Sequence, residues 1–193
     1  RVERAMNANL MYEYVERIGN LIRTNVRKSG IDCGLQPVQI EALHYISRCN
    51  HYSNTPVAVS EYLGLTKGTV SQTLGVLENA GFIEKLADAH DKRVVHLTVT
   101  KLGEETLDRI LPPNTLKAAL GNLSRTDAKL ISEAMETLMI ALQQSNGFKS
   151  FGVCKSCHHH SRGGDGLRHC GLTRELLSST DAEKICREHV AAA

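Results

Sequence analysis

Residues 59–101, VSEYLGLTKGTVSQTLGVLENAGFIEKLADAHDKRVVHLTVTK, contain the pattern that decides the fold. The first half of this stretch predicts two helices joined by a tight turn. The first helix covers Ser60–Leu63, the turn is Gly64–Leu65, and the second helix starts at Thr66 and runs to Asn79. Threonine favours a helix start and glycine favours a helix end, so both boundaries have a physical basis.

The second half predicts a β-hairpin. One strand covers Gly81–Leu86, the tip is Asp88–Lys92, and Arg93–Val99 forms the returning strand. A helix that offers small polar side chains beside an arginine-bearing hairpin has a shape that fits duplex DNA.

Helices are predicted on both sides of this unit. The first covers about residues 3–28, is apolar on one face and is ended by Ser29–Gly30. A second begins at Pro37, and a third runs from the Thr100 cap to about Leu111, where Pro112–Pro113 interrupts it. Residues 114–120 resume helically, and a last strong helix covers about residues 126–145.

The two outer helices are too apolar on one face to stand alone. In the first helix this face carries Met11, Val15, Ile18, Ile22 and Val26, and in the last it carries Leu130, Ala134, Leu138 and Ala141. A symmetric dimer would bury both faces, and its two-fold axis would suit a palindromic DNA site. The alternative is an ordinary core within one chain.

Composition sets wider bounds. An apolar fraction of 41% is enough for a core, and the net charge of +2 does not by itself indicate a nucleic-acid partner. No apolar run approaches the ~18 residues of a membrane span, and no signal-peptide pattern is present, so we expect no membrane partner and a cytoplasmic protein. We interpret residues 191–193, three alanines, as an expression-vector scar.

The pattern from Val59 to Gly103 resembles the MarR family of winged-helix transcription regulators. The residues that carry the resemblance are Val59, Ser60, Leu63, Thr69, Val70, Ser71, Leu74, Leu77, Glu78, Gly81, Phe82, Ile83, Asp91, Arg93, Leu97, Val99, Thr100 and Gly103. The resemblance implies an obligate dimer that binds pseudo-palindromic promoter DNA, usually as a repressor. Many relatives release DNA on binding phenolic ligands or on cysteine oxidation.

The expected fold class is mainly α (α+β), with a winged helix-turn-helix in a helical homodimer and a small Cys-rich extension. Residues 1–147 form the MarR-like dimer domain, with a DNA-binding lobe at about 34–101 and dimerisation helices at about 3–28 and 126–145. Residues 148–190 form the extension, in which one short helix is expected at Asp181–His189.

The candidate DNA-binding residues lie on the second helix and at the hairpin tip. Gln72 suits a bidentate contact to adenine, Lys67 suits a phosphate, and Arg93 suits a narrow minor groove, oriented by Asp91. Thr66 caps the helix, which engages its hydroxyl with backbone amides. The full set is Ser60, Thr66, Lys67, Thr69, Ser71, Gln72, Thr73, His90, Asp91, Lys92 and Arg93.

Four cysteines in the extension have the spacing C-x2-C-x12-C-x15-C, at Cys154, Cys157, Cys170 and Cys186. Four thiolates are enough for one zinc ion or one iron–sulfur cluster, of either the [2Fe–2S] or the [4Fe–4S] type. Structural zinc sites usually pair two C-x2-C knuckles. Only Cys154 and Cys157 form such a pair here, which favours iron–sulfur.

Several alternatives for the tail stay open. The tail cysteines could instead form a disulfide switch or be unrelated thiols. A histidine could replace a thiolate, and the candidates are His158, His159, His160, His169 and His189. We interpret the isolated Cys33 and Cys49 as structural thiols, with peroxide sensing by Cys33 as a minor alternative.

These observations lead to three functional hypotheses, and the favoured one is a non-enzymatic repressor whose promoter binding responds to an iron–sulfur cluster in the tail. The second is a MarR-like repressor with structural zinc and a small-molecule or thiol-oxidation signal. The third, a redox protein using Cys154 and Cys157, is disfavoured because no thioredoxin-type framework surrounds that pair.

Overall fold

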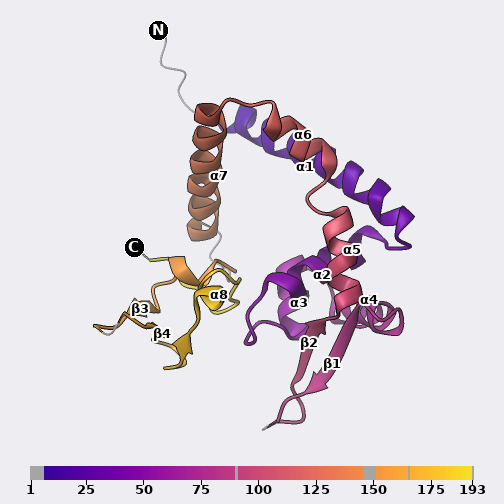
Figure 1. Cartoon of the computed structure of the whole chain (residues 1–193), viewed down its shortest axis with the longest axis vertical. Coiled ribbons are helices and arrows are strands. Elements are labelled where there is room, and N and C mark those ends of the chain that lie inside the picture. The colour runs from indigo at the N-terminus through magenta and orange to yellow at the C-terminus, as the bar shows by residue number, and fades with distance from the viewer. Residues whose placement is uncertain (1–6, 90, 146–150, 165, 193) are drawn as a thin grey trace.

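The computed structural model describes residues 7–89, 91–145, 151–164 and 166–192. Three parts can be followed in Figure 1: long helices at the top, a central lobe that ends in a two-stranded wing, and a small strand-containing unit at lower left. The helices are α1 (Ala8–Asp32), α2 (Pro37–Arg48), α3 (Pro56–Leu63), α4 (Lys67–Asn79), α5 (Lys101–Ile110), α6 (Asn114–Gly121), α7 (Arg125–Ser145) and α8 (Ser179–Ala182), with a 3-10 turn, η1 (Cys154–Ser156). The strands are β1 (Ile83–Ala87), β2 (Val95–Val99), β3 (His160–Arg162), β4 (Arg168–Cys170) and β5 (Leu176–Leu177).

The predicted helix-turn-helix is confirmed, with one change of boundary. Helix α3 begins at Pro56 rather than at residue 60, because Thr55 caps it by accepting a hydrogen bond from the Ala58 amide. Gly64 ends α3 in a left-handed conformation, at φ 65°. Thr66 then caps α4 by accepting a hydrogen bond from the Thr69 amide at 3.2 Å.

One continuous apolar core lies beneath these helices. It is lined by α2, α3, α4, β1, β2 and α5, and its fully buried side chains include Ile40, Leu43, Val59, Leu74, Leu77, Ile83, Leu97 and Ile110. Burying one such side chain stabilises a fold by about 1.5–3 kcal/mol. This shared core therefore fixes the position of α4 relative to the wing strands.

The predicted end of the first helix is wrong. Helix α1 continues through Ser29 and Gly30 to Asp32. Gly30 is buried, and a Cβ placed there would collide with Cδ1 of Ile40. The glycine therefore allows α1 to approach α2 closely and does not stop the helix.

The wing strands are shorter than predicted. Strands β1 and β2 pair antiparallel from Ile83 opposite Val99 to Ala87 opposite Val95. Arg93 therefore lies in the tip and not in the returning strand. The amide of Val94 donates to the Asp91 carbonyl at 2.8 Å, which folds residues 91–94 into a turn.

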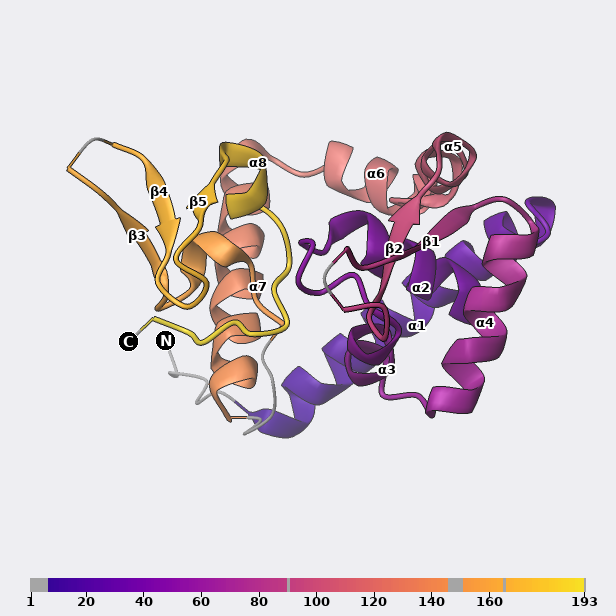
Figure 2. The same cartoon turned by 90° about the horizontal axis from the view of Figure 1, so that it is seen from below.

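Helix α7 stands apart from the lobe (Figure 2). Of its residues, all of which are described, none is buried, and Leu130 is 64% exposed. Further exposed apolar residues of α7 are Ile131, Met135, Met139 and Leu142. The core within one chain therefore does not cover the apolar face of this helix.

The helix predicted over Asp181–His189 is wrong. Helix α8 covers Ser179–Ala182 and is started by a reciprocal pair of hydrogen bonds between Ser178 and Asp181. A three-stranded antiparallel sheet in the order β3-β4-β5 was not predicted, because strands of two or three residues show no readable alternation. Ala191 forms a β-bridge with Cys157, and the Ala192 amide donates to the Ser156 carbonyl. Interpreting residues 191–193 as a vector scar did not predict these backbone contacts.

Candidate DNA interface and four-cysteine site

The outer face of α4 carries most of the predicted base-reading residues. Lys67, Thr69, Ser71 and Gln72 are all exposed. The hydroxyls of Thr66 and Thr69 lie 3.0 Å apart and share a hydrogen bond at the helix start. The exposed face therefore offers one cation, one amide and two small hydroxyls.

The side chains of two predicted DNA-binding residues form hydrogen bonds with the backbone instead. Thr73 is only 7% exposed, and its hydroxyl donates to the Thr69 carbonyl at 2.9 Å. The Ser60 hydroxyl donates to the Leu65 carbonyl at 2.6 Å and so closes the turn between the two helices. In this conformation Thr73 does not reach the exposed face, and Ser60 shapes the turn.

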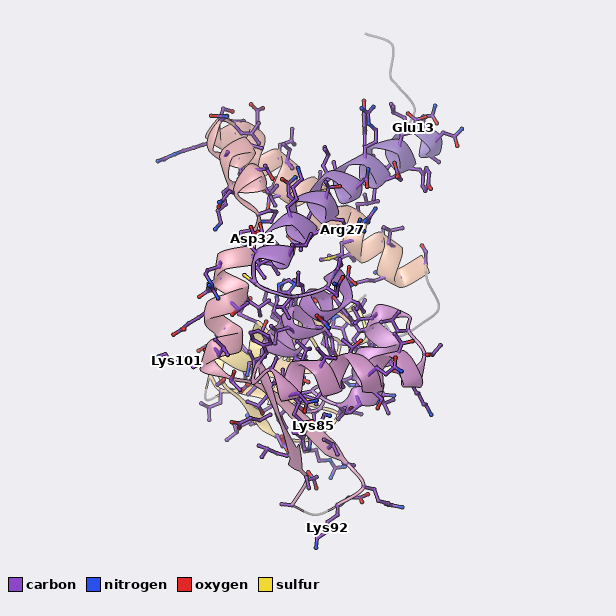
Figure 3. All side chains as sticks on the ribbon, turned by 90° about the vertical axis from the view of Figure 1, so that its right-hand side faces the viewer. Glu13, Arg27, Asp32, Lys85, Lys92 and Lys101 are labelled. Carbon is purple, nitrogen blue, oxygen red and sulfur yellow. The ribbon has the colours of Figure 1, made fainter. Side chains whose placement is uncertain are left out.

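The wing tip holds Arg93 in a defined direction. The Arg93 guanidinium donates to both carboxylate oxygens of Asp91, at 3.0 Å and 2.9 Å, and the Arg93 side chain is 90% exposed. These hydrogen bonds, the side-chain pair first, hold the pKa of Asp91 below its ordinary value. Figure 3 shows Lys92 at the far end of the wing. His90 lies outside the described residues.

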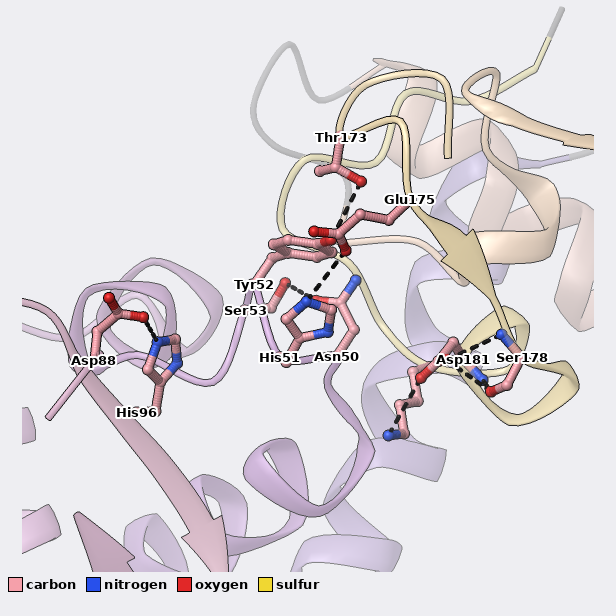
Figure 4. A network of polar contacts seen from close by, with 11 residues as sticks. Asn50, His51, Tyr52, Ser53, Asp88, His96, Thr173, Glu175, Ser178 and Asp181 are labelled. Atoms are coloured by element: carbon pink, nitrogen blue, oxygen red, sulfur yellow. Dashed lines mark hydrogen bonds and ion pairs between the residues drawn. The ribbon is translucent and has the colours of Figure 1, made fainter. Parts of the chain in front are cut away.

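The tip end of the wing strands contains a polar group that the sequence did not single out. His96 lies between Asp88 of the tip and Asn54 of the preceding loop (Figure 4 shows the Asp88 pair). The amide of Asn54 donates to the Leu97 carbonyl at 3.0 Å. In the sequence, this contact is indicated only by strand alternation, which places His96 on the opposite face from the buried Leu97.

The four tail cysteines come together around one cavity. The cavity has a volume of 70 Å³ and is lined by Cys154, Cys157, Cys170 and Cys186, together with Asn50 and Tyr52 of the lobe. His159 and His160 also line it. All six cysteines are free thiols in the described part of the chain.

The thiols influence each other electrostatically. Burial raises the pKa of Cys154 to about 11, and the neighbouring Cys186, Cys157 and Cys170 add to the effect. At Cys170, burial is outweighed by hydrogen bonds from Thr173 and Leu172, which lower the pKa of this thiol. The isolated Cys49 is buried away from solvent, which raises its pKa to about 12 and agrees with a structural thiol.

Within the described residues, no group of three or more Cys, His, Asp or Glu side chains is arranged as a site for a single metal ion. The four cysteines nevertheless share one cavity, and an all-thiolate donor set suits zinc or an iron–sulfur cluster.

The Cys186 segment docks on the helix-turn-helix. Ile185 joins the core of the lobe, and its backbone pairs with Arg48 and Asn50 at 2.9 Å each. The Arg187 amide donates to the Ser53 hydroxyl at 2.8 Å. The Arg187 guanidinium donates to both carboxylate oxygens of Glu61 on α3, at 2.7 Å each. We call residues 184–188 the strap.

A second set of contacts joins the unit to the loop before α3. The Tyr52 hydroxyl donates to the Thr173 hydroxyl at 3.2 Å, and His51 lies 3.6 Å from the Glu175 carboxylate (Figure 4). Phe151 packs edge-on against Tyr45 and Tyr62. The extension is therefore joined to the lobe by apolar, polar and ionic contacts.

An open pocket of 680 Å³ lies where α1 and α6 meet α2 and α5 of the lobe. Its lining includes Ile22, His44, Arg48, Asp108 and Pro112. Burial, followed by the charge of Arg48, lowers the pKa of His44.

Comparison with known proteins agrees with this geometry. Residues 34–94 match the MarR family. The transcriptional repressor MprA of Escherichia coli K12 is 28% identical over 113 residues, which cover 58% of this chain and 64% of MprA, just under two thirds of that relative. The uncharacterized regulator YkoM of Bacillus subtilis is 26% identical over 147 residues, covering 75% of this chain and 87% of YkoM.

Solved structures have a similar fold. A MarR transcriptional regulator from Methanosarcina mazei Go1 superposes with a TM-score of 0.60 at 16% identity, covering 70% of this chain and 98% of the other. The chain thus has the helix-rich α+β winged-helix fold of MarR proteins. No helix in the described ranges is long and apolar enough to cross a membrane.

Proposed function

We propose that this chain is a dimeric transcription regulator, acting as a repressor, whose binding to promoter DNA responds to an iron–sulfur cluster held by Cys154, Cys157, Cys170 and Cys186. The DNA-binding part of the proposal is supported by the MarR-type fold and by the polar exposed face of α4 beside an oriented wing arginine. In this proposal α4 reads base edges in the major groove and Arg93 enters the minor groove.

The dimer part is supported by the exposed apolar faces of α1 and α7. Exposed side chains include Tyr12, Ile18 and Leu21 on α1 and Leu130 and Met139 on α7. Many exposed large apolar side chains on two helices suit an interaction site. A two-fold dimer would present two copies of α4 to a pseudo-palindromic site.

The cofactor part is supported by the cavity. A volume of about 10–15 Å³ is enough for one water, so a cavity of 70 Å³ has room for more than a single ion. Four cysteines at its wall supply the ligand set of a cluster. Such a group supplies a reversible one-electron couple, and its positive iron ions offset the mutual repulsion of four thiolates.

The observation that carries the regulatory part is the position of Cys186. It lies between Ile185, which is packed in the lobe core, and Arg187, which is paired with Glu61 on α3. A change of ligation at Cys186 would move the strap and so α3, the helix that supports α4. Coupling of about 1–3 kcal/mol would change DNA affinity about 5- to 150-fold.

A structural zinc ion with a small-molecule signal is the second candidate. The open pocket of 680 Å³ where α1 and α6 meet the lobe favours it, because a volume of that size has room for a small organic ligand. In that case the four thiols stabilise the tail and the signal enters through that pocket.

The test is a visible spectrum of anaerobically purified protein, with iron, zinc and sulfide measured per chain and DNA affinity measured before and after oxidation. Iron with sulfide, absorption between about 320 and 460 nm, and a redox-dependent affinity are expected. One zinc per chain with redox-independent DNA binding would instead select the second candidate. Absence of DNA binding in every state would overturn the regulator.

A further inference from the structure

We propose that the four-cysteine unit carries a further binding site, an open basic pocket that takes a phosphate group through Arg162 and Arg168. Strands β3 and β4, the turn η1 and helix α8 each contribute to the lining of this pocket. The phosphate can belong to a free small molecule or to the backbone of DNA, and the two sources differ in what they predict for DNA affinity. The site itself does not depend on the proposed DNA-binding function.

The charge of the pocket wall is positive. The pocket has a volume of 780 Å³, which has room for a phosphate group together with the molecule that carries it. Among its described lining residues, three cations face one carboxylate. Arginine suits phosphate because its planar guanidinium presents paired N–H donors to two oxygens at once. The charged and hydroxyl-bearing side chains of the lining are Lys155, Arg162, Arg168, Glu183, Ser179 and Thr180.

The two arginines lie directly opposite each other in the β3–β4 pair. Opposite residues of an antiparallel pair share one face of the sheet, and like charges at such positions destabilise it. The described acidic side chains of the unit pair with other partners. These pairs are Glu183 with Lys155, Asp181 with Lys184, Glu188 with Arg187, and Glu175 with His51. A bound anion would therefore turn an unfavourable contact between Arg162 and Arg168 into a favourable one.

His160 provides a second observation. It lies two residues before Arg162 on β3, so both side chains are on the same face of the strand. Its Nε2 atom is shielded from solvent and has no hydrogen-bond partner among the described residues. Buried polar atoms nearly always have a partner. Because His160 lines the pocket, a polar ligand bound there would satisfy this atom.

The pocket and the cysteine cavity are neighbours. His160 lies opposite Cys170 in the β3–β4 pair and lines both of them. Burial, followed by the charges of Arg168 and Arg162, lowers the pKa of His160, which places both guanidinium charges near this ring. The pocket is thus formed by the same short elements that carry the thiols, so binding must be measured on the full chain with its metal content intact.

The first measurement is a calorimetric titration of the full chain with inorganic phosphate at constant ionic strength, with sodium chloride as the reference salt. We expect saturable binding of phosphate and none of chloride. Arg162→Gln and Arg168→Gln should each weaken phosphate binding about tenfold or more, the size of one hydrogen bond to a charged group. Arg174→Gln is the matched control, because Arg174 is an exposed cation of the same unit outside the described lining, and it should bind as the wild type does.

Two further variants separate binding from folding. Arg168→Lys keeps the positive charge and should lose less affinity than Arg168→Gln. Glu183→Gln removes the carboxylate of the described lining and releases Lys155, so it should tighten phosphate binding about two- to fivefold. A damaged fold would not produce tighter binding. Iron, sulfide and zinc per chain should match the wild type in every variant.

The salt dependence of DNA affinity identifies the source of the phosphate. If it belongs to the DNA backbone, the double variant of Arg162→Gln and Arg168→Gln should lower the slope of log affinity against log salt by about two per chain. If it belongs to a small molecule, the double variant should lose phosphate binding and leave that slope unchanged.

The proposal is overturned if neither phosphate binding nor the salt slope depends on Arg162 and Arg168. The cations would then serve only to offset the charge of the neighbouring thiols. Should the chain bind no duplex at all, the proposed function fails, and the titration with inorganic phosphate alone still decides whether the pocket is a binding site.

Discussion

Arg187 and Glu61 join the four-cysteine unit to the first helix of the helix-turn-helix through two parallel hydrogen bonds of 2.7 Å. The two residues are 126 positions apart in sequence, and their side chains are 25% and 36% exposed. Hydrogen bonding to Glu61 raises the pKa of the Arg187 guanidinium above its ordinary value. This pair is an ionic link between the cysteine unit and the helix that precedes the proposed DNA-reading helix.

Replacing Arg187 by glutamine should therefore weaken the link without removing any cysteine. We expect unchanged metal content, a stability loss of about 1 kcal/mol, and a DNA affinity that no longer follows the state of the thiols. Lys155→Gln is the matched control, because Lys155 pairs with Glu183 at 2.7 Å within the unit. If DNA affinity of Arg187→Gln still follows oxidation as in the wild type, the strap is not the link.

Replacing Arg93 by alanine should weaken binding to every duplex by about 1–3 kcal/mol, with no loss of stability, because the side chain is 90% exposed. Asp91→Asn should lower DNA affinity less, because Arg93 keeps its charge and loses only the carboxylate that orients it. Lys101→Ala, another exposed cation, is the control. Because the Arg93 hydrogen bonds lower the pKa of Asp91, the pair persists at neutral pH and is lost only as pH falls through that lowered pKa. Equal affinities for Arg93→Ala and the wild type would remove Arg93 from the interface.

Serine at Cys170 should remove the metal group and the redox response together. The reason is that Cys170 is one of the four thiols around the cavity. Cys33→Ser is the control, since Cys33 is half-buried at the end of α1, outside that cavity. Iron, sulfide and zinc per chain are the readouts, with DNA affinity in each redox state. Full metal content and a full response in Cys170→Ser would exclude this cysteine as a ligand.

A charge on the apolar face of α7 should prevent dimerisation. Leu130→Glu is expected to give a monomer in light scattering, because burying an unpaired carboxylate in an apolar interface is costly. Leu176→Glu is matched in exposure, at 63% against 64%, and lies in the cysteine unit. A Leu130→Glu protein with the mass of the wild type would place the interface elsewhere.

Alanine at Gly30 should destabilise the lobe by about 1–3 kcal/mol, because the added Cβ collides with Ile40. Gly75 in α4 provides the contrast, since a Cβ there has nothing within 4 Å. Gly75→Ala should be neutral or stabilise by up to about 1 kcal/mol. Urea unfolding measures both, and a neutral Gly30→Ala would mean that α1 can shift away from α2.

Local signals predicted the helix-turn-helix well, for physical reasons. Thr66 caps α4 and Gly64 ends α3, and both effects act within a few residues of the chain. Ile40, Leu43 and Ile46 are buried as their helical spacing indicates. Gly30 misled the prediction because the same residue type serves a helix end and a close crossing, and only the position of Ile40 distinguishes them.

The candidate sites were predictable in part. Spacing in the tail singled out four cysteines, and the structure brings them to one cavity. The contact of Arg187 with Glu61 and that of His96 with Asn54 join residues distant in sequence, so no local pattern reports them. Thr73 was misplaced because helical phase alone did not show which side of α4 faces the core.

The loop that contains Tyr52, Ser53 and Asn54 contacts the cysteine unit through its first two residues and the wing through its third. The tail is therefore not an interchangeable module. A chimera that attaches residues 151–192 to another winged-helix protein would lack the complementary loop and the acidic residue on α3, and its tail would have no docking site. Transplanting the tail would require moving residues 48–61 with it, and the same stretch should tolerate insertions poorly in natural variants of this chain.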